Sequence, residues 1–161
     1  MVSKEVEKLL LKVQKPGRYV GGELNEVIKD KKKVDCRFAF CFPDTYEVGM
    51  SHLGMKILYS LMNAVPYIWC ERVFAPWVDM EEEMIKHNIP LYALESGDPV
   101  SDFDFIGFTL QYELSFTNML NMLRLSGVPI KSCDRKELKN MMKLVYSMIA
   151  VSGILTIAAN T

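Results

Sequence analysis

The amino-acid sequence predicts an α/β fold in which a parallel sheet is flanked by helices within a single domain. Short, mostly apolar segments of strand length alternate along the chain with longer segments whose apolar residues recur at helical spacing. Strands that alternate with helices in this way form parallel sheets with right-handed crossover connections. The length of 161 residues suits one such domain and is sufficient to bury a hydrophobic core.

The order of elements begins with an N-terminal helix and an irregular lead-in over residues 1–33, followed by an α/β domain over residues 34–130. The run Lys15-Pro16-Gly17 ends the first helix, and the pair Gly21-Gly22 keeps the next stretch irregular. In the domain, strands are predicted at residues 34–42, 71–76, 89–95 and 104–110, and helices at residues 50–63, 79–87 and 115–125.

Capping residues and apolar faces support the predicted helices. Asp79 and Glu82 have the spacing of a capping box, Ser115 is a candidate N-cap, and Gly127 is a stop signal for the last of these helices. The side chains expected to point inward are Met50, Leu53, Ile57, Leu58 and Leu61 in helix 50–63, and Phe116, Met119, Leu120 and Leu123 in helix 115–125.

The segment over residues 131–161 differs from the rest of the chain. Residues 134–143 are charged and predict a helix, whereas residues 144–161 contain no charged residue. Eighteen uncharged residues reach the lower bound for a membrane span, but Ser147, Ser152, Gly153 and Thr156 make a poor one. A buried helix end followed by a strand at residues 154–158 is favoured, and a membrane tail anchor is the minority alternative.

Charge and composition exclude some classes of partner. A net charge of −1 with 24% charged residues provides no electrostatic footprint for nucleic acid. The basic cluster at residues 29–33 is interpreted as a solvated turn before the first strand of the sheet. Because the N-terminus lacks an apolar signal core, a cytoplasmic location is expected, with no membrane partner apart from the tail-anchor alternative.

The four cysteines are predicted to be structural thiols, as suits a reducing compartment. Cys36 and Cys41 lie five positions apart on one predicted strand, so their side chains point to opposite faces and do not chelate one metal ion. Cys70 and Cys133 stand alone, and the sequence contains no Cys-x-x-Cys motif. No metal ligands are therefore assigned.

Two loops of the predicted sheet are candidates for a ligand site. The first contains Asp44, Thr45, Tyr46 and Gly49 and joins an apolar strand to a helix, and the second extends from Thr109 to Ser115 after another strand. Both follow the carboxyl ends of strands, where parallel sheets bind their ligands. The two loops are therefore expected to meet at one edge of the sheet.

Residues 16–130 resemble the N-terminal region of radical SAM proteins that carry a cobalamin-binding domain. The resemblance rests on the runs Lys-Pro-Gly-Arg-Tyr-Val-Gly-Gly-Glu, which begins at Lys15, and Phe-Pro-Asp-Thr-Tyr-Glu-Val-Gly-Met-Ser-His-Leu-Gly, which begins at Phe42. The resemblance implies a flavodoxin-like, Rossmann-like domain that lies ahead of a radical SAM barrel. It also implies a cobalamin that approaches the loop after the first strand.

In this resemblance, Asp44-x-Tyr46-x-x-Gly49 corresponds to the cobalamin signature Asp-x-His-x-x-Gly, whose histidine ligates cobalt. A neutral phenol is a far weaker ligand than imidazole, so cobalamin is expected to bind here without a protein histidine ligand. Thr109 and Gln111 correspond to a Ser-x-Leu element. Either the Thr109 hydroxyl bonds to the nucleotide tail of the cofactor, or it satisfies nearby backbone while Gln111 opens the loop.

A third element of the family, a Gly-Gly pair after the next strand, is missing beyond Ile130, where Gly153 is the only glycine. No Cys-x-x-x-Cys-x-x-Cys triad occurs, so the 4Fe-4S cluster and S-adenosylmethionine are expected only in a full-length relative. After about residue 131 the sequence is expected to be truncated or altered, or else to be that of a natural short relative with a different last strand.

The favoured function is therefore a cobalamin-binding-type domain of a radical SAM protein, without the catalytic barrel and not catalytic alone. The alternative is a structural or interaction module of the same fold with no cofactor. A flavodoxin or a phospho-receiver is least favoured, because the Asp44 loop has a single threonine and the chain offers only Asp44 of the acids that a receiver needs.

Overall fold

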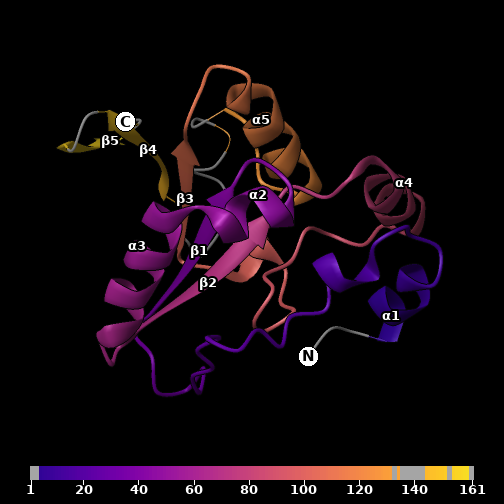
Figure 1. The fold of residues 1–161 in the computed structure, drawn as a ribbon, viewed down its shortest axis with the longest axis horizontal. Helices are drawn as coiled ribbons and strands as arrows, with labels where there is room; N and C mark the ends of the chain where they lie inside the picture. Colours follow the sequence, from indigo (N-terminus) through magenta and orange to yellow (C-terminus); the bar gives the residue numbers. More distant parts are fainter. Residues whose placement is uncertain (1–3, 132–133, 135–143, 152–153, 160–161) are drawn as a thin grey trace.

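A computed structural model of the chain describes residues 4–131, 134, 144–151 and 154–159 (Figure 1). The described residues form a five-stranded sheet in the order β2-β1-β3-β4-β5. The first four strands of this order are mutually parallel, and β5 is antiparallel to β4. The strands are β1 (Cys36–Phe42), β2 (Ile68–Phe74), β3 (Phe105–Leu110), β4 (Leu144–Val151) and β5 (Ile154–Ala159).

This strand order is that of flavodoxin-like folds, so the predicted α/β fold class is confirmed. The helices are α1 (Lys4–Leu10), α2 (Tyr46–Ser51), α3 (Leu53–Ala64), α4 (Val78–His87) and α5 (Ser115–Leu125). Two short 3-10 helices, η1 (Pro16–Arg18) and η2 (Val100–Asp102), lie in the connections.

Alternating side chains of the strands build a core on each face of the sheet. Ala39 and Cys41 of β1 join one core with buried residues of α1, α4 and α5. Phe40 and Phe42 join the other core, which includes Met55 of α3. Because successive strand residues point to opposite faces, a strand that is apolar throughout can serve both cores. In Figure 1, α3 and α4 accordingly lie on opposite sides of the strands.

The strand predicted at residues 89–95 is wrong. Its backbone N–H groups donate to three separate parts of the chain: Leu91 to Leu125 at the end of α5, Ala93 to Asp98 in a loop, and Leu94 to Arg72 of β2. Only an isolated bridge between Tyr92 and Pro99 has strand geometry. The apolar pattern reflects burial, but no single neighbouring strand pairs with this segment.

The helix predicted at residues 50–63 is two helices, because the chain turns at His52 between α2 and α3. The imidazole Nδ1 of His52 accepts a hydrogen bond from the backbone N–H of Met55 at 3.2 Å and so caps α3. The prediction that Leu53, Ile57 and Leu61 point inward is also wrong, because they are 69%, 50% and 61% exposed.

The starts of the next two helices also differ from prediction. The N-cap of α4 is Trp77, and Asp79 instead accepts a hydrogen bond from the backbone N–H of Gln14 at 2.8 Å. Ser115 is the first residue of α5 rather than its cap. Of the side chains expected inward from α5, Leu123 is buried, Met119 packs against the core, and Phe116 and Leu120 are exposed. Gly127 ends the helix at a φ of +67°, as predicted.

The lead-in is bonded to the sheet and to α3 over residues 27–29. Val27 donates its backbone N–H to the Tyr59 hydroxyl at 2.8 Å and accepts a hydrogen bond from the Trp69 indole at 2.9 Å. The ammonium of Lys29 donates to the carbonyls of Asn63, Val65 and Ile68 at 2.5 to 2.9 Å. Lys29 is therefore not part of a solvated turn, because it satisfies carbonyl groups at the end of α3 and at the start of β2.

Residues 144–151 form β4, so the expected helix end there is wrong, whereas β5 agrees with the strand predicted at residues 154–158. Residues 135–143, for which a helix was predicted, lie outside the described residues. In the part of the chain that the structure describes, no helix has the length and apolar character of a membrane span.

Cys36, Cys41 and Cys70 are free thiols, and burial raises the pKa of Cys41 well above its ordinary value. The described residues contain no cluster of metal-ligating side chains. Cys133 lies outside the described residues.

Candidate functional site

The carboxyl ends of β1 and β3 form the topological switch point of the sheet. β1 lies between β2 and β3, so the chain leaves β1 toward one side and, after β2, returns on the other. Open α/β sheets bind ligands where the strand order reverses in this way. The loops that follow β1 at Phe42 and β3 at Leu110 border this point.

A direct hydrogen bond joins the two loops. The Tyr112 hydroxyl donates to Oδ2 of Asp44 at 2.8 Å, and Oδ1 of the same carboxylate accepts from the backbone N–H of Thr45 at 2.7 Å. The side-chain amide of Asn118 on α5 adds a hydrogen bond to the carbonyl of Pro43 at 2.9 Å. The hydrogen bond to Asp44 raises the pKa of Tyr112. The expected meeting of the two loops is therefore present.

Sequence reasoning missed Tyr112 and Asn118, which make these contacts. Their side chains come from a loop and a helix that lie 68 and 75 positions beyond their partners in the sequence. A polar residue soon after a predicted strand was the available signal for Tyr112, but nothing in the sequence marks its partner.

Thr109 and Gln111 lie together at the end of β3. Thr109 is buried, and its hydroxyl accepts a hydrogen bond from the side-chain amide of Gln111, which is itself exposed. The polar partner of Thr109 is thus a side chain two residues away in the sequence. This pair and Asp44 place amide, hydroxyl and carboxylate groups on the two loops of the switch point.

Tyr46 lies on the β2 side of the Asp44 loop. Its ring packs edge-on against Phe74 of β2, with the ring centroids 5.5 Å apart, and its hydroxyl donates to the carboxylate of Glu23 in the lead-in. Burial, together with the hydrogen bond to Glu23, raises the pKa of Tyr46 to about 12. The phenol is therefore neutral near pH 7 and is held by two partners within the chain.

Gly49 lies on α2 where this helix approaches β2. A Cβ atom at this position would be 2.3 Å from Cε1 of Phe74 and 3.2 Å from Cδ1 of Phe42. The packing of aromatic rings thus accounts for the glycine without any ligand. Its φ is not in the left-handed region, so close approach and not backbone conformation requires it.

Thr45 and Glu47 complete the Asp44 loop. Thr45 is the N-cap of α2, although its side chain makes no capping hydrogen bond. The carboxylate of Glu47 accepts hydrogen bonds from Arg18 at 2.9 Å and from Lys15 at 3.2 Å. The hydrogen bond from Arg18 is the main reason that the pKa of Glu47 falls to about 2. The lead-in is thereby tied to the start of α2.

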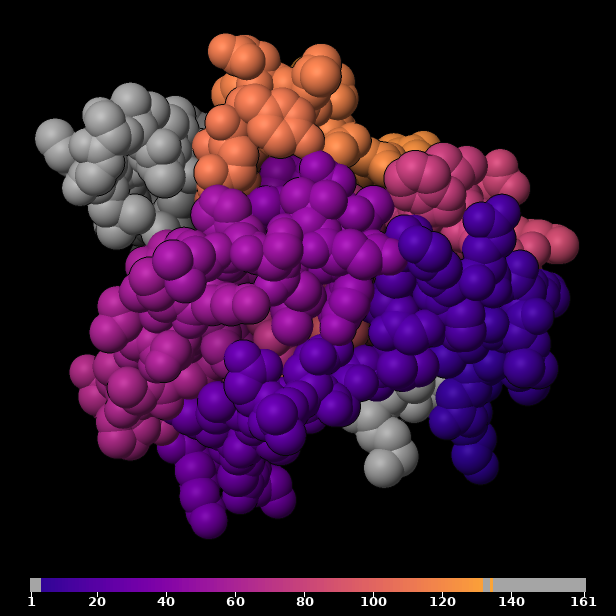
Figure 2. Space-filling model, viewed as in Figure 1, coloured from indigo at the N-terminus to yellow at the C-terminus, as the bar shows by residue number. Residues whose placement is uncertain are grey.

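Exposed apolar side chains follow three of the parallel strands. In Figure 2 the segment after β3, in orange, stands above the α2 region. These side chains are between 45% and 75% exposed, and they are Val48 after β1, Trp77 and Val78 after β2, and Tyr112, Leu114 and Phe116 after β3. We call this set the apolar rim.

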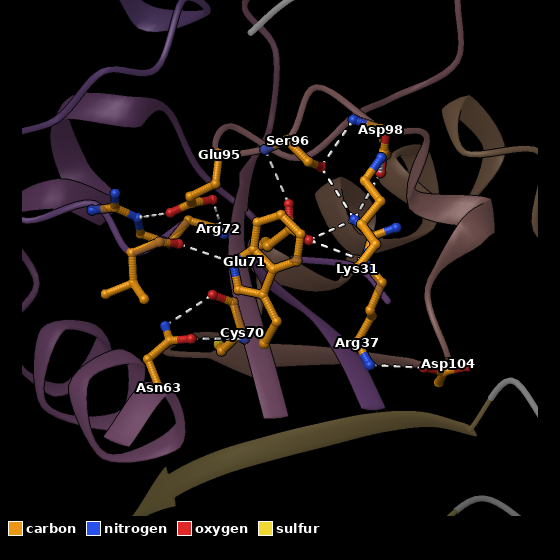
Figure 3. Close-up of polar contacts among 12 residues, drawn as sticks. Lys31, Arg37, Asn63, Cys70, Glu71, Arg72, Glu95, Ser96, Asp98 and Asp104 are labelled. Atoms are coloured by element: carbon orange, nitrogen blue, oxygen red, sulfur yellow. Dashed lines mark hydrogen bonds and ion pairs between the residues drawn. The ribbon is translucent and has the colours of Figure 1, made fainter. Parts of the chain in front are cut away.

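A separate cluster of buried charges lies at β1, at the edge strand β2 and in the segment that contains Glu95 (Figure 3). Glu71 is fully buried and accepts hydrogen bonds from Arg37 at 2.6 Å and from the backbone N–H of Ser96 at 3.0 Å. Arg72 donates through Nε to Glu95 at 2.5 Å. Burial raises the pKa of both carboxyl groups. These pairs attach residues 95–98 to the sheet, and the sequence pattern of a buried strand gave no sign of them.

Comparison with protein families gives one match. The model of a family described as "Radical SAM proteins, N-terminal" matches residues 54–156, which is more than half of the chain. The match begins at Gly54, the last residue of the second of the two sequence runs that carried the resemblance, and it continues past residue 131, where the sequence was expected to diverge. No curated protein and no solved structure matches the chain.

Proposed function

Because the chain belongs to the family of N-terminal regions of radical SAM proteins, we propose that it holds cobalamin beside a radical SAM barrel and is not catalytic alone. The barrel carries the 4Fe-4S cluster and S-adenosylmethionine in a full-length protein and is the proposed partner of this domain. The free thiols of Cys36, Cys41 and Cys70 support a reducing, cytoplasmic location for it.

The observation that supports this proposal most is the junction of two loops at the switch point. Asp44 and Tyr112 join them at 2.8 Å, and Thr109 with Gln111 supplies a hydroxyl and an amide at the same edge. Cobalamin is a large ligand whose amide-bearing ring and phosphate-bearing tail need donors and acceptors of these kinds. The apolar rim offers exposed apolar side chains after the same strands, which could contact the ring.

The chemistry of the donor set fits cobalamin only if the protein does not ligate cobalt. The phenol of Tyr46 is neutral and held by Glu23 and Phe74. We therefore assign Asp44, Thr109 and Gln111 to the polar groups of the cofactor. Thr45, Tyr46 and Gly49 shape the loop beneath it. Cobalamin itself supplies a cobalt centre that can carry an alkyl group.

Gel filtration with hydroxocobalamin tests the proposal. At micromolar protein, cobalamin absorbance should elute with the chain, and Tyr46→Phe should leave both the retention and the spectrum unchanged. Thr109→Val should weaken binding about tenfold, because it replaces a buried hydroxyl with a methyl group of similar size that makes no hydrogen bond. Glu113→Gln, an exposed change in the same loop, is the matched control. Absence of retained absorbance with the unaltered chain would contradict cobalamin binding.

A cofactor-free interaction module is the second candidate, and the surroundings of Gly49 and Tyr46 favour it. Contacts within the chain account for these two residues of the motif without a cofactor. On this view the apolar rim contacts the barrel directly. The outcome that selects this candidate is an unaltered chain that retains no cobalamin together with a Tyr46→His variant that does.

A further inference from the structure

β2 is an edge strand of the sheet, and its outer edge carries backbone groups that a further strand could bond. In the strand order β2 lies at one end, beside β1. The backbone groups of Ile68, Cys70 and Arg72 bond to atoms outside β1, so these three residues form the outer edge. Edges of this kind, when unpaired, are the places at which one chain adds a strand to another.

Side chains, and not a neighbouring strand, bond most of these outer groups. The amide of Asn63 at the end of α3 donates to the Cys70 carbonyl at 2.9 Å and accepts from the Cys70 N–H at 3.0 Å. The carboxylate of Glu95 accepts from the Arg72 N–H at 2.7 Å. The ammonium of Lys29 donates to the carbonyl of Ile68 at 2.5 Å. Figure 3 shows Asn63 and Glu95 facing β2 in this way.

Backbone atoms bond the remaining outer groups. The N–H of Ile68 donates to the carbonyl of Val65 at 3.2 Å, and the carbonyl of Arg72 accepts from the N–H of Leu94 at 2.9 Å. Each outer N–H and C=O of Ile68, Cys70 and Arg72 thus has a partner. None of these partners belongs to a second strand of the sheet.

β2 lacks the other features that protect edge strands from pairing. Its sequence, Ile-Trp-Cys-Glu-Arg-Val-Phe, contains no proline and no lysine and is rich in residues that favour strands. It pairs with β1 in unbroken register from Ile68 to Phe74, so no bulge bends it. The charges of Glu71 and Arg72 are buried in ion pairs within the chain. Protection of the edge therefore depends on the side chains that bond it.

We propose that Lys29, Asn63 and Glu95, which we call the edge seal, keep β2 from pairing with β2 of a second copy of this chain. The Asn63 amide presents a donor and an acceptor to Cys70, as the peptide group of a neighbouring strand does. Lys29 and Glu95 also line a surface groove of about 530 Å³, so this edge adjoins open space.

The partner that fits an opened edge follows from its chemistry. Without the edge seal, each copy offers unpaired N–H and C=O groups, which are costly to leave without partners. Two such strands pair antiparallel about a two-fold axis, because the same groups then meet in both directions. This role of the edge seal is independent of any ligand at the switch point.

Asn63→Ala tests the edge seal by size-exclusion chromatography with light scattering, from micromolar to millimolar protein. The variant should form dimers about tenfold more tightly than the unaltered chain, because it leaves the Cys70 N–H and C=O without partners. Asn121→Ala is the matched control, since Asn121 also lies on a helix and its amide donates to Glu81 at 2.9 Å, away from β2. This control should associate no more than the unaltered chain.

Hydrogen–deuterium exchange identifies the surface that pairs. In Asn63→Ala, the amides of residues 68–72 should exchange more slowly at high protein concentration than at low, because pairing protects them. Dimers that leave this exchange unchanged would show association through another surface, such as the exposed Leu53, Ile57 and Leu61 of α3, and would overturn the proposal.

If Asn63→Ala does not fold, as judged by circular dichroism, Lys29→Met takes its place. Methionine retains the aliphatic part of the side chain but lacks the ammonium that bonds the Ile68 carbonyl. Its control is Lys32→Met, which changes an exposed lysine. In either test, association no tighter than that of the control would overturn the proposal and show that water satisfies the freed groups.

Discussion

At Gly49, the glycine of a ligand-binding motif is also required by packing. The ring of Phe74, 25 positions later in the sequence, occupies the space in which a side chain would lie. The sequence marks the glycine but not this neighbour, because the contact depends on how α2 rests against β2. The same holds for Tyr46, whose partners Glu23 and Phe74 flank it from both directions along the chain.

Replacing Gly49 with alanine tests this packing. A Cβ 2.3 Å from a ring carbon forces the ring or the helix to move, so Gly49→Ala should lower the free energy of unfolding by about 1–3 kcal/mol. Gly17→Ala is the control, since a Cβ there meets no atom within 4 Å. Urea denaturation measures both variants. Equal midpoints for the two would contradict the assigned role of Gly49.

The ion pairs of Glu47 predict a dependence of stability on pH. Arg18 and Lys15 lower the pKa of this carboxyl from 4.5 to about 2. The stabilisation is therefore fully present above pH 4.5 and is lost as the pH falls toward 2. In low salt, the melting temperature of Glu47→Gln should lie below that of the unaltered chain at pH 7, and the difference should shrink at pH 3.

The control for this measurement is Glu113→Gln, an exposed carboxylate that makes no ion pair within the described residues. Its difference from the unaltered chain should stay small at both pH values. A Glu47→Gln difference that stays constant between pH 7 and pH 3 would show that the ion pairs contribute nothing measurable, as is common for partly exposed pairs.

Among the elements, α3 shows why an apolar pattern does not always identify the buried face. The exposed side chains Leu53, Ile57 and Leu61 recur at intervals of four, and so do the buried Met55 and Tyr59. Helical spacing predicts the element but cannot choose between two apolar faces. The choice depends on the sheet and on the lead-in, where Val27 provides the donor for the buried Tyr59 hydroxyl.

Two substitutions on α3 distinguish the faces. Met55→Ala should lower the free energy of unfolding by about 2–5 kcal/mol, because it leaves a cavity beside Phe40 and Phe42. Ile57→Ser should change it by less than about 1 kcal/mol, because half of that side chain already contacts solvent. Chemical denaturation provides both values. A larger loss of unfolding free energy for Ile57→Ser than for Met55→Ala would instead support the buried face that the sequence pattern predicted.

For the whole molecule, the alternation of strands and helices was sufficient to predict the parallel sheet and the edge at which its loops meet. The pattern failed where burial has other causes. Residues 89–95 are apolar because they cover the core, and Glu71 and Arg72 are buried because Arg37 and Glu95 pair with them. Contacts between distant charged residues leave no periodic signal in a single sequence.

The C-terminal segment also differs from the prediction, which expected a divergent tail with a helix end where the structure has β4. β4 pairs in parallel with β3 from Phe105 opposite Leu144 to Leu110 opposite Ile149. It thus occupies the next position of the sheet, and the family match extends over it. The uncharged residues 144–151 and 154–159 form paired strands, in which β5 is antiparallel to β4.

The hydrogen bonds of Val27 bear on the order in which the chain folds. They join residues 32 and 42 positions apart, and β1 and β2 pair across a similar separation, Cys36 with Ile68. Closing either loop has a similar entropic cost, so the lead-in and the β1–β2 pair should form at the same stage. We expect Trp69→Phe, which loses the indole donor, to slow folding as much as a β2 core substitution does, with a similar φ-value.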